Sequence, residues 1–151
     1  MALFETSTTL NSTILTVFEF MIRPANLVKI APPEAKLAFL DPPETLGPGC
    51  RFEFQVSGVG PVQQIEHEII QFEHPRSFTE LQIRGPLRAY QHEHIFHEQS
   101  NGSIQVIDRI EFEPPGGLAG FLINENWIRN SLQAGFEYRQ RELKRLLESS
   151  E

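Results

Sequence analysis

The sequence lacks most of the features that mark exported or membrane-spanning proteins. Cys50 is the only cysteine among 151 residues, so no internal disulfide can form. No run of about 18 apolar residues is present. The N-terminus also lacks the basic start and apolar stretch of a signal peptide. These absences predict a soluble, cytoplasmic protein without a transmembrane segment.

Charge and motif spacing exclude further classes. The chain has 13 Lys and Arg against 20 Asp and Glu, a formal net charge of -7 at pH 7, so nucleic acid would be repelled. The glycine-rich stretches GLAG and PPGG lack the spacing of a phosphate-binding loop. A nucleophile elbow is absent, and no second acid is predicted beside Asp108, which argues against classical hydrolases and glycosidases.

Hydrophobic alternation predicts a run of antiparallel strands. The length suits one domain, so we expect residues 1–151 to form a single unit. LFETSTTL near the N-terminus alternates as a strand does, and short loops join five further alternating segments. These five segments are RFEFQV, VQQIEHEIIQFE, SFTELQI, AYQHEHIFHEQ and SIQVIDRIEFE.

Two segments predict helices. Between Leu118 and Leu147 the apolar residues recur every three or four positions, which predicts one long amphipathic helix. The stretch STILTVFEFM fits a strand or a helix, and we favour a helix capped by Asn11 or Ser12.

Four stretches carry a further signal: FEFMIRPANLVKIAPP after the first strand, YQHEHIF and VIDRIEFEPPGG in two late strands, and GFEYRQREL in the last helix. They resemble the START and Bet v 1-like (SRPBCC) superfamily, in particular its bacterial ligand-binding, polyketide cyclase/dehydrase-like branch. Tyr90 stands where this branch commonly has Trp.

The resemblance implies an α+β helix-grip fold. About six to seven antiparallel strands would curve around the long C-terminal helix, with two short helices after the first strand. Members of the superfamily enclose a cavity for apolar ligands and range from lipid carriers and hormone receptors to aromatic cyclases, so the fold alone does not fix the function.

The histidine-rich stretch YQHEHIFH, residues 90–97, is the main candidate for chemistry. Alternation places Tyr90, His92, His94 and Phe96 on one face, which we expect to point inward. In the next strand one face holds Ile104, Val106, Asp108, Ile110 and Phe112. A three-residue turn at Ser100-Asn101-Gly102 keeps both faces on the same side and sets His94 opposite Asp108.

The His94–Asp108 pair has three interpretations. It could be a buried structural pair that specifies register, a polar anchor for a ligand, or a catalytic acid and base in which Asp108 orients His94. The carboxylate would favour a charged imidazole. His92, His94 and Asp108 could ligate a metal, but a fourth ligand is not evident, so we expect neither metal nor cofactor. We interpret His67 as a histidine at the edge of the core.

Arg139 interrupts the apolar stripe of the last helix, beside Gly135. It would either lay its stem along the core and reach solvent, or present a cation at the mouth of a cavity. The leading hypothesis is a protein that binds or carries a small apolar or amphipathic molecule, with no oligomeric state specified. The alternatives are a cyclase/dehydrase-like lyase and a protein-binding accessory module. The predicted ligand-binding residues are Tyr90, His92, His94, Phe96, Asp108, Ile110, Phe112, Leu132, Phe136 and Arg139.

Overall fold

The computed structural model describes residues 1–58 and 60–148 as one curved antiparallel sheet with helices on one side. The sheet has seven strands in the order β1-β7-β6-β5-β4-β3-β2. The strands are β1 (Ala2–Leu10), β2 (Ala38–Leu40), β3 (Arg51–Gly58), β4 (Gly60–Glu73), β5 (Ser77–Arg84), β6 (Ala89–Glu98) and β7 (Ile104–Glu113). The expected α+β architecture is confirmed, and β2 is a short edge strand that the sequence pattern did not indicate.

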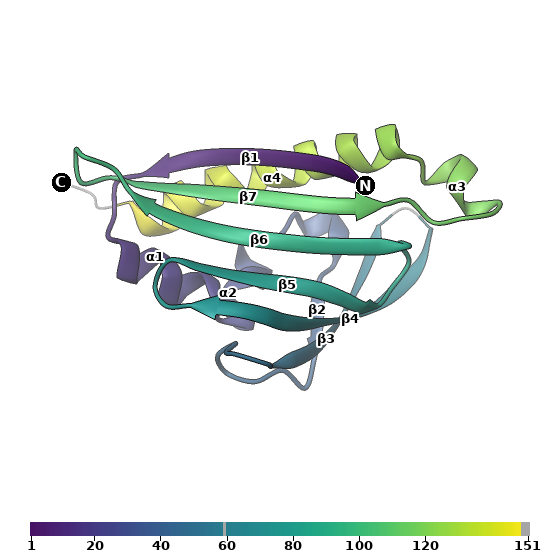
Figure 1. Ribbon diagram of the computed structural model, residues 1–151, viewed down its shortest axis with the longest axis horizontal. Coiled ribbons are helices and arrows are strands. Elements are labelled where there is room, and N and C mark those ends of the chain that lie inside the picture. Colours follow the sequence, from purple (N-terminus) through teal and green to yellow (C-terminus); the bar gives the residue numbers. More distant parts are fainter. Residues whose placement is uncertain (59, 149–151) are drawn as a thin grey trace.

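Four helices accompany the sheet in the described residues, together with a 3-10 turn at Pro33–Ala35. They are α1 (Ile14–Met21), α2 (Pro24–Lys29), α3 (Ala119–Leu122) and α4 (Glu125–Leu147). Figure 1 shows α4 crossing behind β1 and β7, whereas α1 and α2 lie lower on the same side. Arg129 and Gln140 fix this crossing, because they donate hydrogen bonds to Leu3 O and Thr6 Oγ1 of β1 at 2.8 and 3.1 Å.

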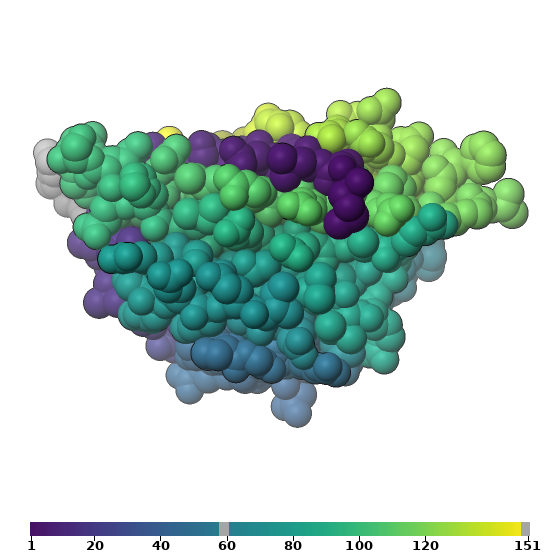
Figure 2. Space-filling view, viewed as in Figure 1, coloured from purple at the N-terminus to yellow at the C-terminus, as the bar shows by residue number. Residues whose placement is uncertain are grey.

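The predicted single helix from Leu118 to Leu147 is interrupted, because α3 and α4 are separated at Ile123 and Asn124. The chain is extended at Asn124, whose side chain accepts a hydrogen bond from Trp127 N and starts α4 there. Leu118, Phe121 and Leu122 therefore lie outside the core, with exposures of 85%, 79% and 79%. The space-filling view shows this light-green segment projecting beyond one end of the sheet (Figure 2).

The predicted helix α1 is confirmed, but its cap is Thr13 rather than Asn11 or Ser12. Thr13 Oγ1 accepts a hydrogen bond from Thr16 N, while the backbone N–H of Asn11 donates to Glu148 Oε2. One face of α1 buries Val17, Phe18 and Met21 against the sheet.

The β6–β7 register is as predicted. His94 lies opposite Asp108 and Tyr90 opposite Phe112. The turn has the expected form, since Gln99 N donates to Ser103 O at 2.9 Å and Gly102 has φ of +87°, in the left-handed region that glycine adopts without strain.

Two clusters of buried apolar side chains form the core. The larger joins α1 and α2 to the sheet around Phe18 and Phe78, and the smaller joins β1 and β7 to α4 around Phe112 and Ile128. Among the described residues, no helix combines the length and apolar composition needed to cross a membrane.

Candidate functional site

A cavity of about 320 Å³ lies between the two core clusters. One wall comes from the larger cluster and its satellites, and the other from Tyr90 and α4. The first wall includes Leu27, Ile30, Phe39, Phe52 and Phe54. The second includes Tyr90, Leu132, Gly135 and Phe136. The floor between these apolar walls is polar.

Neighbouring strands build this floor from inward-facing positions. His67 comes from β4, Glu80 from β5, and His92 and His94 from β6. Glu80 lies directly opposite His92 in the β5–β6 ladder, and residues opposite one another share a face of the sheet. Asp108 of β7 lies behind them and is 2% exposed.

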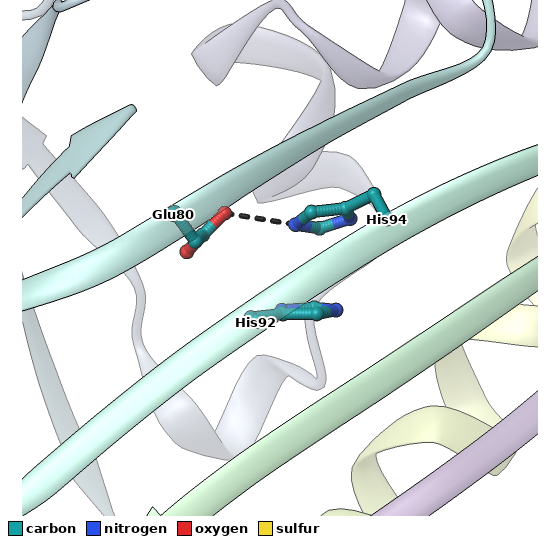
Figure 3. Close-up of side chains that lie close together, drawn as sticks. All are labelled: Glu80, His92 and His94. Atoms are coloured by element: carbon teal, nitrogen blue, oxygen red, sulfur yellow. Dashed lines mark hydrogen bonds and ion pairs between the residues drawn. The ribbon is translucent and has the colours of Figure 1, made fainter. Parts of the chain in front are cut away.

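Hydrogen bonds join these five side chains in two groups, one around Glu80 and one around Asp108. Glu80 binds two imidazoles, His67 Nδ1 at Oε1 (2.8 Å) and His94 Nε2 at Oε2 (2.9 Å). Asp108 Oδ1 binds His92 Nε2 at 2.8 Å. Figure 3 shows Glu80 reaching across to His94, with the His92 ring in a roughly parallel plane beside it. The two rings stack with centroids 3.7 Å apart, and Phe78 stacks on His94 at 4.1 Å.

The predicted contact between His94 and Asp108 is only partly right. The two residues are opposite one another, but His94 Nδ1 stays 3.5 Å from Asp108 Oδ1 and makes no hydrogen bond. Asp108 instead binds His92, its diagonal neighbour, because long side chains can reach the next cross-strand position on the same face. The orienting carboxylate of His94 is Glu80.

Burial dominates the electrostatics of the imidazole at the centre. Burial and the nearby His92 lower the pKa of His94 to about 4, although Glu80 and Asp108 oppose this shift. Asp108 does favour the charged imidazole, as expected, but its effect is too small to keep His94 charged at neutral pH. Desolvation outweighs the attraction of the two carboxylates.

The two carboxylates are ionised despite their burial. Burial raises the pKa of Glu80, but the hydrogen bonds from His67 and His94 more than offset it and hold the pKa well below the usual range. For Asp108, burial is likewise outweighed by the hydrogen bond from His92 and the charge of Arg139, so its pKa is lowered. Burial raises the pKa of Tyr90, which keeps the phenol protonated.

Arg139 turns its guanidinium toward the cavity floor instead of solvent. Its Nη2 lies 3.9 Å from Asp108 Oδ1, and its Cζ lies 5.3 Å from the ring centre of Phe136. Among the described residues, neither Nε nor Nη2 has a hydrogen-bond partner. The ionised Asp108 compensates part of this buried positive charge.

Six of the ten predicted ligand-binding residues line the cavity: Tyr90, His92, His94, Leu132, Phe136 and Arg139. Asp108 lies directly behind His92. Phe96, Ile110 and Phe112 do not line it. Phe96 packs against Phe18 in the larger core cluster, while Ile110 and Phe112 are covered by the smaller one. The inward face of a strand thus divides between cavity and solid core, because α1 and α4 cover different parts of the sheet.

The sequence interpretation missed Glu80 and underestimated His67. Alternation in SFTELQI places Glu80 on the face of Phe78, but nothing in the sequence fixes how β5 pairs with β6. His67 is buried within the network and does not lie at the edge of the core. Their positions follow from the tertiary pairing of three strands.

No protein-family model and no curated protein matches this sequence. Solved structures do resemble it in fold. Protein CV1439 from Chromobacterium violaceum is 13% identical over 99% of this chain and 100% of that one, with a TM-score of 0.76. Major latex-like protein 151 from Panax ginseng is 13% identical over 95% of each chain, with a TM-score of 0.71.

Another similar structure is the di-domain ARO/CYC StfQ from the steffimycin biosynthetic pathway. It is 13% identical over 96% of this chain and 50% of that one, with a TM-score of 0.73. Structural similarity at 13% sequence identity establishes the fold but not the activity. The fold expected from the sequence is confirmed.

Proposed function

We propose that this chain, which has the helix-grip fold of the START and Bet v 1-like superfamily, binds a small, largely apolar molecule in the cavity between its sheet and α4. The observation that carries this proposal is the cavity itself. Its volume of about 320 Å³ falls within the range of about 300–1,000 Å³ typical of small-molecule sites, which combine apolar walls with a few polar groups.

Apolar and polar side chains of the cavity bind different parts of the ligand. The aromatic and aliphatic walls bury the apolar body of the ligand. The polar floor, with His92, His94, Glu80 and the guanidinium of Arg139, orients a polar substituent. An accessory module with a filled core is less consistent with this arrangement, because a core without a ligand closes such a space at native packing density.

Gly135 supports the proposal independently. It lies within α4, where glycine costs roughly 0.5–1 kcal/mol relative to alanine. A Cβ at this position would meet no described atom within 4 Å. No close contact therefore requires glycine here, and its missing side chain adds to the open volume of the cavity that it lines.

Replacing Gly135 with leucine is expected to fill the cavity and block binding. The probe is 2-naphthol, a neutral two-ring alcohol whose own fluorescence reports binding. Gly135→Leu should weaken its binding at least about tenfold, a loss of roughly 1.4 kcal/mol of binding free energy. Thermal stability should rise, because leucine is the better helix former.

Ala134→Leu is the matched control, since Ala134 is the exposed neighbour in the same helix. It adds the same side chain outside the cavity, and its 2-naphthol titration should match that of the unmodified protein. Equal binding by all three proteins would contradict the proposed site. Equal loss in both variants would place binding on the outer surface of α4.

The second candidate function is proton transfer of the cyclase/dehydrase kind. The hydrogen bond from His92 Nε2 to the ionised Asp108 favours it, because a carboxylate that fixes one nitrogen leaves the other to face a bound molecule. We give this role to His92 in place of His94, because His92 is the imidazole that hydrogen-bonds to Asp108. His92→Gln would abolish turnover of an identified substrate, whereas a carrier would retain its ligand at reduced affinity.

A further inference from the structure

We propose that Glu80, His92 and His94 form a binding site for a first-row transition-metal ion at the cavity floor. One ligand atom from each of the three side chains lies within 4.8 Å of the other two. The three residues come from two adjacent strands (Figure 3), and all three line the cavity. This site does not depend on the proposed binding of an apolar molecule.

From the sequence we expected no metal, because only His92, His94 and Asp108 were candidate ligands. The structure gives a different set of candidate ligands. Glu80 supplies a carboxylate next to both histidines, and Asp108 takes a supporting position. Two imidazoles and one carboxylate, with further coordination positions open toward a cavity, suit Zn²⁺, Fe²⁺ or Co²⁺ better than Mg²⁺ or Ca²⁺.

The outer partners of these ligands are those that metal sites use. A metal-bound histidine usually donates its other ring N–H to a carboxylate, which fixes its tautomer and orientation. His92 does so toward Asp108 at 2.8 Å. Glu80 is held in the same way by His67 at 2.8 Å from Oε1. Both outer partners are buried.

Charge also favours a cation. Two carboxylates, those of Glu80 and Asp108, lie in this buried space, and the guanidinium of Arg139 lies 3.9 Å from Asp108. Arg139 approaches this group from the side of Asp108, and its side chain is not one of the three that converge. A divalent ion would compensate the remaining carboxylate charge of Glu80 directly.

The movement needed is small but specific. Ligand atoms on one tetrahedral ion lie about 3.4 Å apart for bonds of about 2.1 Å, so each atom must move inward by less than about 1 Å. Phe78 and His92 hold His94 between them. His92 is therefore the ring that turns out of the stack, and the Glu80–His94 hydrogen bond is exchanged for bonds to the metal.

Tag-free protein, dialysed against a chelator, tests the site with Co²⁺ and Zn²⁺ alone. Calorimetry should give one equivalent per chain, and Co²⁺ should acquire the visible absorption of nitrogen and oxygen coordination. Glu80→Gln and His92→Gln should lose this equivalent. Asp108→Asn, which alters only an outer partner, should weaken binding about 10- to 100-fold. His97→Gln, on the exposed outer face of β6, should bind like the unmodified protein.

Nuclear magnetic resonance of the unmodified protein tests the site without relying on the folding of any variant. On adding Zn²⁺, the ring nitrogens of His92 and His94 should shift strongly, and those of His74 and His97 should not. Absence of one-equivalent binding would overturn the proposal. Shifts confined to His74 would also overturn it, because His74 Nε2 lies 2.6 Å from Glu19 Oε1 at an exposed position away from the cavity floor. The 2-naphthol titration is read separately, so failure of the metal site leaves the apolar site untouched.

Discussion

Replacing Asp108 with alanine is expected to lower the free energy of unfolding by about 3–5 kcal/mol, the usual cost of removing one partner from a buried ion pair. Asp108 is 2% exposed and serves two groups. It accepts the hydrogen bond from His92 and lies 3.9 Å from the buried Arg139. Without it, no carboxylate of the described residues lies within 4.0 Å of the buried guanidinium.

Urea denaturation measures this change, and Glu93→Ala is its matched control. Glu93 lies on the opposite face of β6, and its carboxylate pairs with Arg109 Nη1 at 3.1 Å. Both side chains are more than a third exposed, Glu93 at 35% and Arg109 at 41%. Exposed pairs contribute less than about 1 kcal/mol. A loss of that small size for Asp108→Ala as well would show that the polar floor does not stabilise the fold.

The second large effect is a loss of stability as pH falls through the range in which His94 titrates. The imidazole of the unfolded chain takes up its proton near pH 6.5, whereas the folded protein resists protonation until about pH 4. The unfolded state therefore binds more protons between these values. The stability that the neutral His94 contributes is fully present above pH 6.5. It is lost as the pH falls toward 4, by up to about 3 kcal/mol.

Glu80 and Asp108 extend the decline to lower pH. Their pKa values are lowered in the folded protein, so the stability that they contribute is present above their unfolded values of 4.5 and 3.8 and is lost below them. The two carboxylates do not account for the change between pH 6.5 and 4.5. That upper range belongs to the buried imidazole.

Unfolding free energies measured in urea at a series of pH values, in chelator-containing buffer, test this assignment. His94→Gln keeps a donor for Glu80 but cannot titrate, so its stability should stay nearly constant between pH 6.5 and 4.5. His97→Gln should follow the unmodified protein, because His97 is exposed. If the unmodified protein keeps constant stability over this range, the burial of a neutral His94 is wrong.

Local rules were sufficient for the β6–β7 hairpin. The left-handed Gly102 and the odd number of turn residues determine which side chains face inward, and both are visible in the sequence. The start of α4 can also be predicted from the sequence, because Asn124 is a strong N-cap residue just before Glu125. The apolar spacing of Leu118, Phe121 and Leu122 points instead to a longer helix, and the cap residue is the stronger signal.

The polar network depends on information that no single segment contains. Glu80 reaches two histidines only because β5 lies between β4 and β6 in a register set by the whole sheet. Whether Asp108 binds His92 or His94 depends on the direction in which its side chain leans along the strand. Strand alternation does not specify that direction. The division between cavity and solid core likewise depends on where α1 and α4 cross the sheet.

Native mass spectrometry tests the central claim most directly. Tag-free protein is incubated with a small-molecule extract of cells, freed of unbound material, and compared with Gly135→Leu treated in the same way. We expect a single organic adduct on the unmodified chain and none on the variant. Bare mass for both proteins, or the same adduct on both, would contradict an apolar binding chamber beneath α4.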